Sequence, residues 1–106
     1  MSNRLEKLLQ FHQEDPQDPF TVYALALEYT LIDVEKAKEY YGKLLTEYPD
    51  YVATYYHAAQ FYTDLNMFEK AEQLYKKGIE VSQKVKNIHA ERELKAAYQN
   101  FLFENM

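Results

Sequence analysis

The sequence contains no cysteine, and only two of its 106 residues are glycine. Without cysteine the chain has no disulfide, no thiolate nucleophile and no cysteine-bound zinc. Two glycines cannot build a glycine-rich loop that cradles a phosphate, and the GxGxxG, GK[ST] and HExxH motifs are absent. These absences exclude several large classes of enzyme and agree with a reducing compartment.

Long apolar runs are also missing. The most apolar stretch, from Phe20 to Val34, is too short to cross a bilayer and is interrupted by Glu28 and Asp33. The first residues, MSNRLEKLLQF, hold no apolar segment ahead of a small-residue cleavage site. We therefore expect a cytoplasmic protein without a signal peptide and without a membrane partner.

Positive charge is scarce. The chain has 12 lysines and arginines against 17 aspartates and glutamates, a net charge of −5, and residues 1–34 hold two basic and six acidic groups. Proteins that bind nucleic acid present a basic surface to the phosphates. We therefore expect no nucleic-acid partner and no attraction to anionic lipid.

Apolar residues recur every three or four positions through most of the chain, which is helical spacing, and no alternating strand pattern competes. The first helix is expected to stop before the segment EDPQDP, and Pro49 to end the third. Asn66 and Glu69 have the spacing of a capping box. Short loops of two to five residues predict that neighbouring helices pack antiparallel. In all we predict about six helices, the last five of them capped by Asp18 (with Pro19 as the first helical residue), Asp33, Asp50, Asn66 and Asn87.

Two segments of the chain are near copies of each other. VEKAKEYYGKLLTE, residues 34–47, and FEKAEQLYKKGIE, residues 68–80, share Glu-Lys-Ala, then a tyrosine, then a lysine at the same spacing. Ala37 and Ala71 lie 34 positions apart, and Ala26 and Ala59 in the preceding helices lie 33 apart. A helix pair that repeats at this period indicates a stacked array, because one pair cannot bury its own apolar stripe.

The residues at particular positions of the copies resemble the tetratricopeptide repeat family. Its pattern has a bulky, a small and an aromatic residue in the first helix, then Ala, an aromatic and a small residue in the second. Val22 departs from the usual Trp, and Leu44 from the usual small residue. The matching positions are Val22, Ala26, Tyr29, Ala37, Tyr41 and Leu44 in one copy, and Tyr55, Ala59, Tyr62, Ala71, Tyr75 and Gly78 in the other.

The resemblance implies an all-α fold, a right-handed superhelical array of antiparallel helix pairs. It divides the single domain expected over residues 1–106 into four parts. These are an N-terminal half-repeat helix (1–15), repeat 1 (18–49), repeat 2 (50–86) and a capping helix (87–106).

The resemblance also implies a binding face. In this family the first helix of each pair lines the concave face, where segments of partner proteins lie, so we expect an adaptor for another protein or peptide. The face should be neutral and rich in tyrosine, without the Lys and Arg that clamp carboxylates in some members. An alternative, that Tyr23 and Tyr56 only pack against their neighbours, is left open. The positions are Phe20, Tyr23, Leu27 and Thr30 in one copy, and Ala53, Tyr56, Gln60 and Thr63 in the other, with His57 beside them.

No catalytic or metal-binding pattern competes with this interpretation. His57 has no second histidine or carboxylate cluster near it in sequence, and His12 and His89 fall near predicted helix ends. We therefore predict no enzymatic activity, no metal and no cofactor. The second hypothesis is a structural homodimer that buries the end of the array around Phe101, Leu102 and Phe103.

Overall fold

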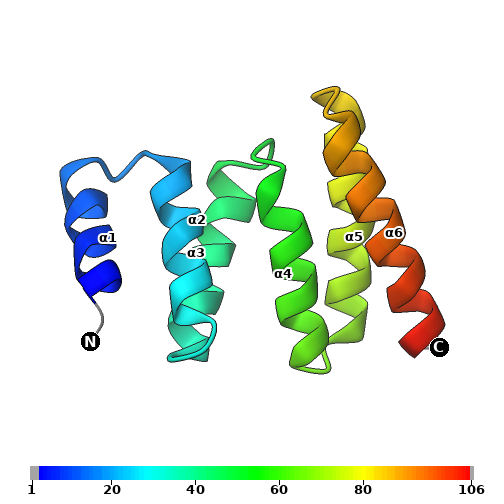
Figure 1. Ribbon diagram of the computed structural model, residues 1–106, viewed down its shortest axis with the longest axis horizontal. Coiled ribbons are helices and arrows are strands. Elements are labelled where there is room, and N and C mark those ends of the chain that lie inside the picture. Colours follow the sequence, from blue (N-terminus) through cyan, green and yellow to red (C-terminus); the bar gives the residue numbers. More distant parts are fainter. Residues whose placement is uncertain (1–2, 106) are drawn as a thin grey trace. The chain divides into compact units, whose positions relative to one another are not determined.

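The computed structural model describes residues 3–105, which form six α-helices and, within that range, no strand (Figure 1). The chain divides into two compact units, residues 1–51 and residues 52–106. Loops of three to five residues join the helices, as predicted. The first unit holds α1 (Asn3–Glu14), α2 (Pro19–Tyr29) and α3 (Val34–Glu47), and the second holds α4 (Ala53–Asp64), α5 (Phe68–Lys84) and α6 (Ile88–Asn105).

In the first unit, α2 contacts both α1 and α3 and runs antiparallel to each (Figure 1). Its predicted start is confirmed, because the Asp18 side chain accepts a hydrogen bond from the Phe20 amide at 3.1 Å and Pro19 is the first helical residue. The third helix also begins as predicted, with the Asp33 side chain accepting from the Lys36 amide at 3.2 Å. The first helix runs through Glu14, one residue into the EDPQDP segment.

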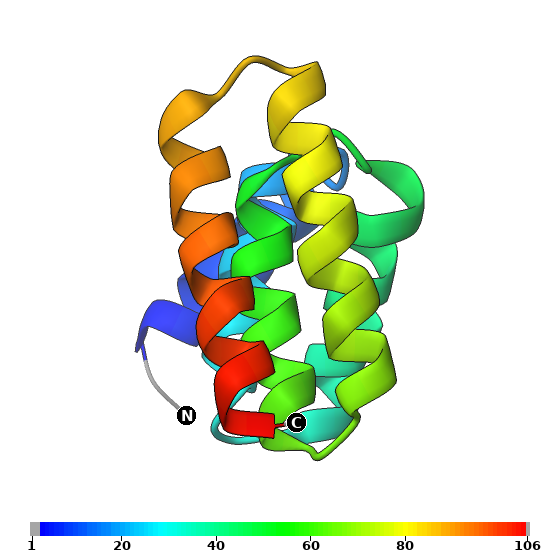
Figure 2. The ribbon, with the colours of Figure 1, turned by 90° about the vertical axis from the view of Figure 1, so that its right-hand side faces the viewer.

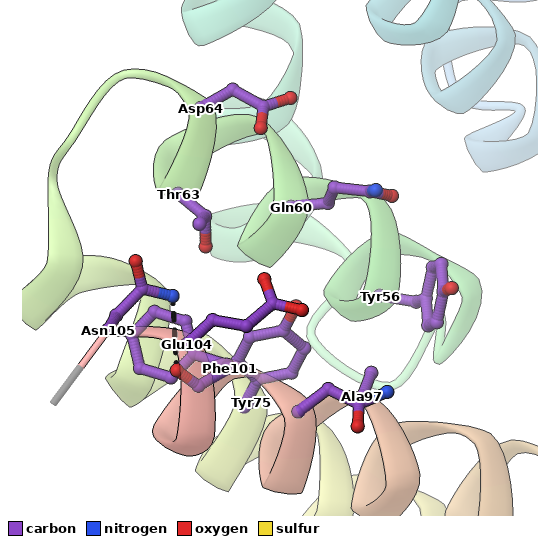
Figure 3. Close-up of a pocket in the computed structure, with 10 residues that line it drawn as sticks. Tyr56, Gln60, Thr63, Asp64, Tyr75, Ala97, Phe101, Glu104 and Asn105 are labelled. Atoms are coloured by element: carbon purple, nitrogen blue, oxygen red, sulfur yellow. Dashed lines mark hydrogen bonds between the residues drawn. The ribbon is translucent and has the colours of Figure 1, made fainter.

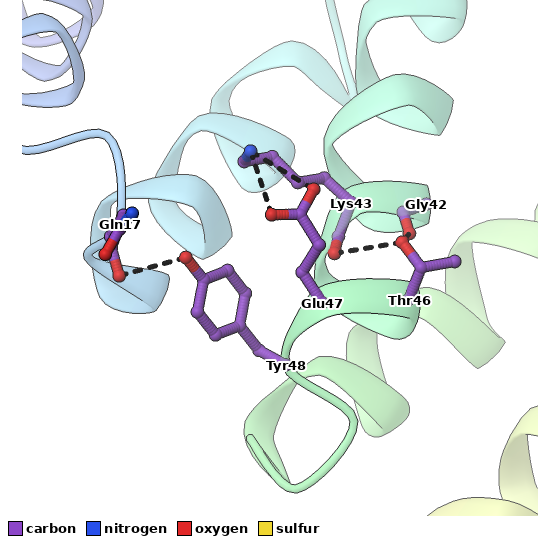
Figure 4. Close-up of polar contacts among 6 residues, drawn as sticks. All are labelled: Gln17, Gly42, Lys43, Thr46, Glu47 and Tyr48. Carbon is purple, nitrogen blue, oxygen red and sulfur yellow. Dashed lines mark hydrogen bonds and ion pairs between the residues drawn. The ribbon is translucent and has the colours of Figure 1, made fainter.

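The core of the first unit is aliphatic near α1 and aromatic near α3. The rings of Tyr29 and Tyr40 stack with their centroids 5.7 Å apart. At the end of α3, the Tyr48 hydroxyl donates to the Gln17 carbonyl at 3.0 Å, which ties this end to the loop between α1 and α2 (Figure 4). The aliphatic cluster consists of Leu5, Leu8, Ala24 and Leu25, with Leu9 packed against it.

In the second unit, α4 contacts both α5 and α6 (Figure 2). The helices approach closely at Gly78, where an added Cβ atom would lie 2.5 Å from the Cβ of Tyr55 and 3.2 Å from a methyl carbon of Leu94. Further along, the rings of Tyr75 and Phe101 lie 5.4 Å apart. The small residue Gly78 on α5 therefore lets α4 and α6 pack closely against α5, and the three helices share one core.

Two of the five predicted caps are wrong. Asn66 does not begin α5 but closes α4, in a left-handed conformation with φ 61°. Its amide donates to the Thr63 carbonyl at 2.9 Å, and the Met67 amide donates to the Tyr62 carbonyl at 2.9 Å. This is the Schellman arrangement, which asparagine tolerates because it adopts positive φ more easily than most residues. Met67 occupies the N-cap without a side-chain hydrogen bond, so Glu69 forms no capping box with Asn66.

The other wrong cap is Asp50. The Tyr51 amide donates to the Tyr48 carbonyl at 3.0 Å, so Asp50 lies inside a turn. The fourth helix begins at Ala53, with Val52 at the N-cap. By contrast, the prediction for the last helix is confirmed, because Oδ1 of Asn87 accepts from the Ala90 amide at 3.0 Å.

Candidate functional site

A cavity of about 250 Å³ lies in the second unit between α4 and α6, with α5 contributing to its lining (Figure 3). Helical spacing explains which side chains meet there, because positions three or four apart share a face of a helix. The lining consists of Tyr56, Gln60, Thr63 and Asp64 from α4, Tyr75 from α5, and Ala97, Asn100, Phe101, Glu104 and Asn105 from α6.

Aromatic rings form the buried part of this cavity. Tyr75 and Phe101 are almost fully buried, whereas Tyr56 is half-buried. Burial raises the pKa of the Tyr75 hydroxyl, and the neighbouring Tyr56 and Asp64 raise this pKa further. The hydroxyl therefore stays neutral at pH 7 and keeps its proton for donation.

Three predicted site residues of α4 line this cavity: Tyr56, Gln60 and Thr63. Gln60 is exposed, and the Thr63 hydroxyl donates to the Ala59 carbonyl at 2.8 Å. Ala53, the first residue of α4, and His57 are not among the lining residues.

His57 is half-buried beside the Tyr56 ring, with the ring centroids 5.3 Å apart. Burial lowers the pKa of His57, and the negative charge of Glu93 opposes this effect in part. The imidazole is therefore biased toward its neutral form, which suits packing and hydrogen bonding.

The predicted residues of the first unit lie in other surroundings. Tyr23 packs edge-on against Tyr51, with 5.8 Å between ring centroids. Phe20 is 58% exposed and lines a second cavity, of about 490 Å³, together with Phe11. Leu27 is half-buried, and the Thr30 hydroxyl donates to the Ala26 carbonyl at 2.9 Å.

Sequence reasoning missed the contribution of α6 to the cavity. The last helix was predicted only as a capping helix, whereas Asn100, Glu104 and Asn105 line the cavity beside Phe101. Their spacing from Ala97 onward is helical and marks one face, but the sequence does not say which element that face meets. Asp64 and Glu104 add two negative charges to the lining, whereas the predicted residues in it carry no formal charge.

Within residues 3–105, no three His, Asp or Glu side chains converge on a point where they could hold a metal ion. No helix in that same range combines the length and the apolar character that crossing a bilayer requires. The arrangement of aromatic rings, amides and two carboxylates around the cavity is suited to contact with another molecule by packing and hydrogen bonding.

Comparisons with known proteins agree with this architecture. The tetratricopeptide repeat family model matches residues 33–99. No curated protein sequence matches the chain. A solution NMR structure of a tetratricopeptide repeat domain protein from Salinibacter ruber is 38% identical with a TM-score of 0.77, over 82% of this chain and 89% of that one. A crystal structure of a tetratricopeptide repeat domain protein from Salinibacter ruber is 36% identical with a TM-score of 0.74, over 80% and 96%.

These matches confirm the predicted fold, an all-α superhelical array of the tetratricopeptide type. They agree with the repeated segments, both of which begin within the matched residues. The chain belongs to the tetratricopeptide repeat family, whose domains are generally non-catalytic scaffolds that bind protein partners.

Proposed function

We propose that this chain is a non-catalytic adaptor that holds a segment of another protein in the cavity between α4 and α6. The observation that carries the proposal is the mixed lining of this cavity, with aromatic rings at its buried part and amide side chains around them. Interfaces that recognise peptides combine rigid aromatic anchors with a few well-placed polar groups.

Each kind of side chain has a separate task in this proposal. Tyr56 and Phe101 offer apolar surface to a side chain of the partner, and Tyr56 adds a polar tip. The amides of Gln60 and Asn100 can both donate and accept, so they suit the backbone of an extended segment. The described lining contains no Lys or Arg, so an acidic C-terminus is not a preferred ligand.

The remaining predictions complete the proposal. Tyr23, Leu27 and Thr30, with Phe20 beside them, form the binding face of the first unit, and His57 belongs to that of the second. The chain works as one domain with a half-repeat helix (1–15), two repeats (18–49 and 50–86) and a capping helix (87–106), in the cytoplasm. The contact between Tyr23 and Tyr51 leaves the purely structural interpretation of Tyr23 open.

The test is a capture experiment with three baits: wild type, Tyr56→Ala and Phe103→Ala. Phe103 is 89% exposed on α6 and does not line the cavity, so it controls for the loss of an aromatic ring. Each bait is first shown to be folded by circular dichroism. We expect a protein from native lysate to be retained by wild type and by Phe103→Ala but lost from Tyr56→Ala.

Equal retention by all three baits would contradict the proposal and place the interaction outside the cavity. A fourth bait, Tyr23→Ala, tests the first unit separately. Loss of the same partner from Tyr23→Ala would support a role for the first unit in binding, whereas full retention would restrict recognition to the second unit.

Self-assembly is the second candidate, and the exposure of Phe103 favours it. A ring with 89% of its surface in water is a suitable anchor for a second copy. Light scattering over a wide concentration range tests this idea. A mass that rises with concentration in wild type, but not in Phe103→Ser, would support a homodimer. A constant mass of 12.7 kDa would eliminate it.

A further inference from the structure

The cavity of the second unit lies between two helix ends of the same polarity. The fourth and sixth helices run in the same direction (Figure 1), and both contribute their last turn to the lining. Asp64 is the last residue of α4, and Glu104 is the residue before the end of α6. The C-terminus of a helix carries partial negative charge, so two helix ends and two carboxylates act together at this end of the cavity.

No basic side chain in the described lining compensates for these charges. The described lining holds neither Lys nor Arg, and within residues 3–105 neither Asp64 nor Glu104 takes part in an ion pair. By contrast, acidic residues elsewhere in this unit have basic partners, such as Glu91, which lies 2.8 Å from the Lys95 ammonium. The negative potential of the cavity is therefore available to a cation from outside the chain.

The buried part of the cavity restricts which cation fits best. Tyr75 and Phe101 present aromatic rings there, tilted by 49° to each other. The side-chain amides of Gln60 and Asn100 also line the cavity, and their oxygens can accept hydrogen bonds. A guanidinium group is planar, stacks on aromatic faces, and has five donors for surrounding carboxylate and amide oxygens.

We infer that this cavity receives an arginine side chain of the partner protein, with Asp64 and Glu104 as its counter-charges and the aromatic rings as its packing surface. The inference rests on the proposed function, since it names the chemistry of the partner at the same site. The guanidinium stacks against the rings, and its N–H groups donate to the two carboxylates that line the same cavity.

The test needs no knowledge of the partner. ¹⁵N-labelled protein is titrated with N-acetyl-arginine N-methylamide and, separately, with the citrulline analogue, which has nearly the same shape and no charge. We expect the arginine probe to shift the amide resonances of Tyr56, Asn100 and Glu104 in a saturable way. The citrulline probe should bind at least about tenfold more weakly, since it lacks the charge that the carboxylates recognise.

Substitutions then test whether the carboxylates of Asp64 and Glu104 bind the arginine probe. The double substitution Asp64→Asn, Glu104→Gln should weaken arginine binding at least about tenfold while preserving shape. The control is Glu80→Gln on α5, an exposed acid paired with Lys77 at 3.4 Å and outside the cavity, and it should bind like wild type. Equal binding of arginine and citrulline would overturn the inference, and so would an equal loss in the control.

The capture experiment and the titration fail in different ways. If Tyr56→Ala loses a captured partner but the arginine probe does not bind in the cavity, the arginine inference is wrong and the adaptor proposal stands. If the probe binds at Asp64 and Glu104 but no partner depends on Tyr56, the cation site is supported and the adaptor proposal is wrong.

Discussion

Gly78 lies where three helices meet, and it has no room for a larger side chain. A Cβ atom there would be 2.5 Å from the Cβ of Tyr55 and 3.1 Å from its Cγ, and the Cβ of Tyr55 is bonded directly to the backbone, so it cannot rotate aside. We predict that Gly78→Ala lowers the free energy of unfolding by about 1–3 kcal/mol, the usual cost of overpacking. Urea denaturation followed by circular dichroism measures this change.

Gly42 is the matched control, since it is also a helical glycine but has no atom within 4 Å of an added Cβ. Here alanine only restricts the unfolded chain and improves helix propensity, so Gly42→Ala should stabilise the protein by about 0.5–1 kcal/mol. If both substitutions moved the urea midpoint in the same direction, the assignment of opposite surroundings to the two glycines would be wrong.

Lys86 closes α5 in the left-handed region, with φ 60°. The Asn87 amide donates to the Ser82 carbonyl at 2.9 Å, and the Lys86 amide donates to the Gln83 carbonyl at 3.1 Å, so the geometry repeats the one at Asn66. A side chain with a Cβ pays about 1–2 kcal/mol for this conformation, whereas glycine does not. We therefore predict that Lys86→Gly raises the free energy of unfolding by about 1 kcal/mol.

Thermal unfolding at a fixed pH tests this prediction. Asn66→Gly is the matched control, because asparagine already tolerates positive φ and should gain less. An unchanged or lower melting temperature for Lys86→Gly would mean that the lysine side chain makes compensating contacts.

His57 should make stability depend on pH. Burial lowers its pKa in the folded chain below the ordinary value of 6.5, so the unfolded chain binds the proton more tightly. The free energy of unfolding is therefore unaffected well above pH 6.5 and decreases as the pH falls through 6.5 toward the folded pKa. We predict a smaller loss of stability between about pH 7.5 and 5.5 for His57→Gln than for wild type.

A His57→Gln variant that followed the wild-type curve would show that other groups cause the pH dependence.

Helix caps show which local features a sequence can predict. Asp18, Asp33 and Asn87 were predicted correctly because each directly precedes its helix and bonds to an amide two or three residues later. Asn66 and Asp50 are equally suitable by residue type. They were predicted wrongly because their backbone conformations are set by other features. The end of α4 determines the backbone of Asn66, and the turn before α4 determines that of Asp50.

Helix α6 carries two phenylalanines in opposite surroundings. Phe101 is 7% exposed and lies near the rings of Tyr75, Phe68 and Tyr98, whereas Phe103 is 89% exposed. We predict that Phe101→Ala costs about 3–5 kcal/mol of unfolding free energy, as truncation of a buried aromatic ring does. Phe103→Ala should stay within about 0.5 kcal/mol of wild type, as a surface change does.

Guanidinium denaturation of the two variants side by side measures this difference. A comparable loss for both would show that α6 is docked through a wider surface than its buried stripe. The sequence predicted a capping helix, and Leu94 and Phe101 form its buried stripe. It did not predict the polar face toward α4, because the rotation of a capping helix follows from packing against residues some 30 to 50 positions earlier.

The fold was predictable over most of the chain because two copies of one residue pattern each specify the same pair of helices. Two of the paired positions, Ala37 with Ala71 and Ala26 with Ala59, are fully buried in both copies. The cavity was predictable only in part, because α6 belongs to no complete repeat and so lies outside the pattern. Asp64 and Glu104 are 40 positions apart, and only the tertiary arrangement of the second unit shows that they share a cavity.

The net charge of −5 gives a prediction for the complex as a whole. If the partner supplies arginine to an acidic cavity, long-range attraction should speed the encounter, and salt should weaken this attraction as the Debye length falls from about 10 Å at 0.1 M to about 3 Å at 1 M. We therefore predict that the association rate with the captured partner falls several-fold between about 0.05 and 0.5 M NaCl, while the dissociation rate changes less. Surface plasmon resonance measures both rates.

Variants of the cavity distinguish two effects in this measurement: long-range attraction before the complex forms, and contacts within the formed complex. Asp64→Asn, Glu104→Gln should slow association and reduce its salt dependence, because the double change removes two charges but leaves the rings in place. Tyr56→Ala should leave the salt dependence unchanged and speed dissociation, since a truncated anchor affects the formed complex. An association rate that is independent of salt would argue against a basic partner, and an unchanged dissociation rate in Tyr56→Ala would argue against the cavity as the place of contact.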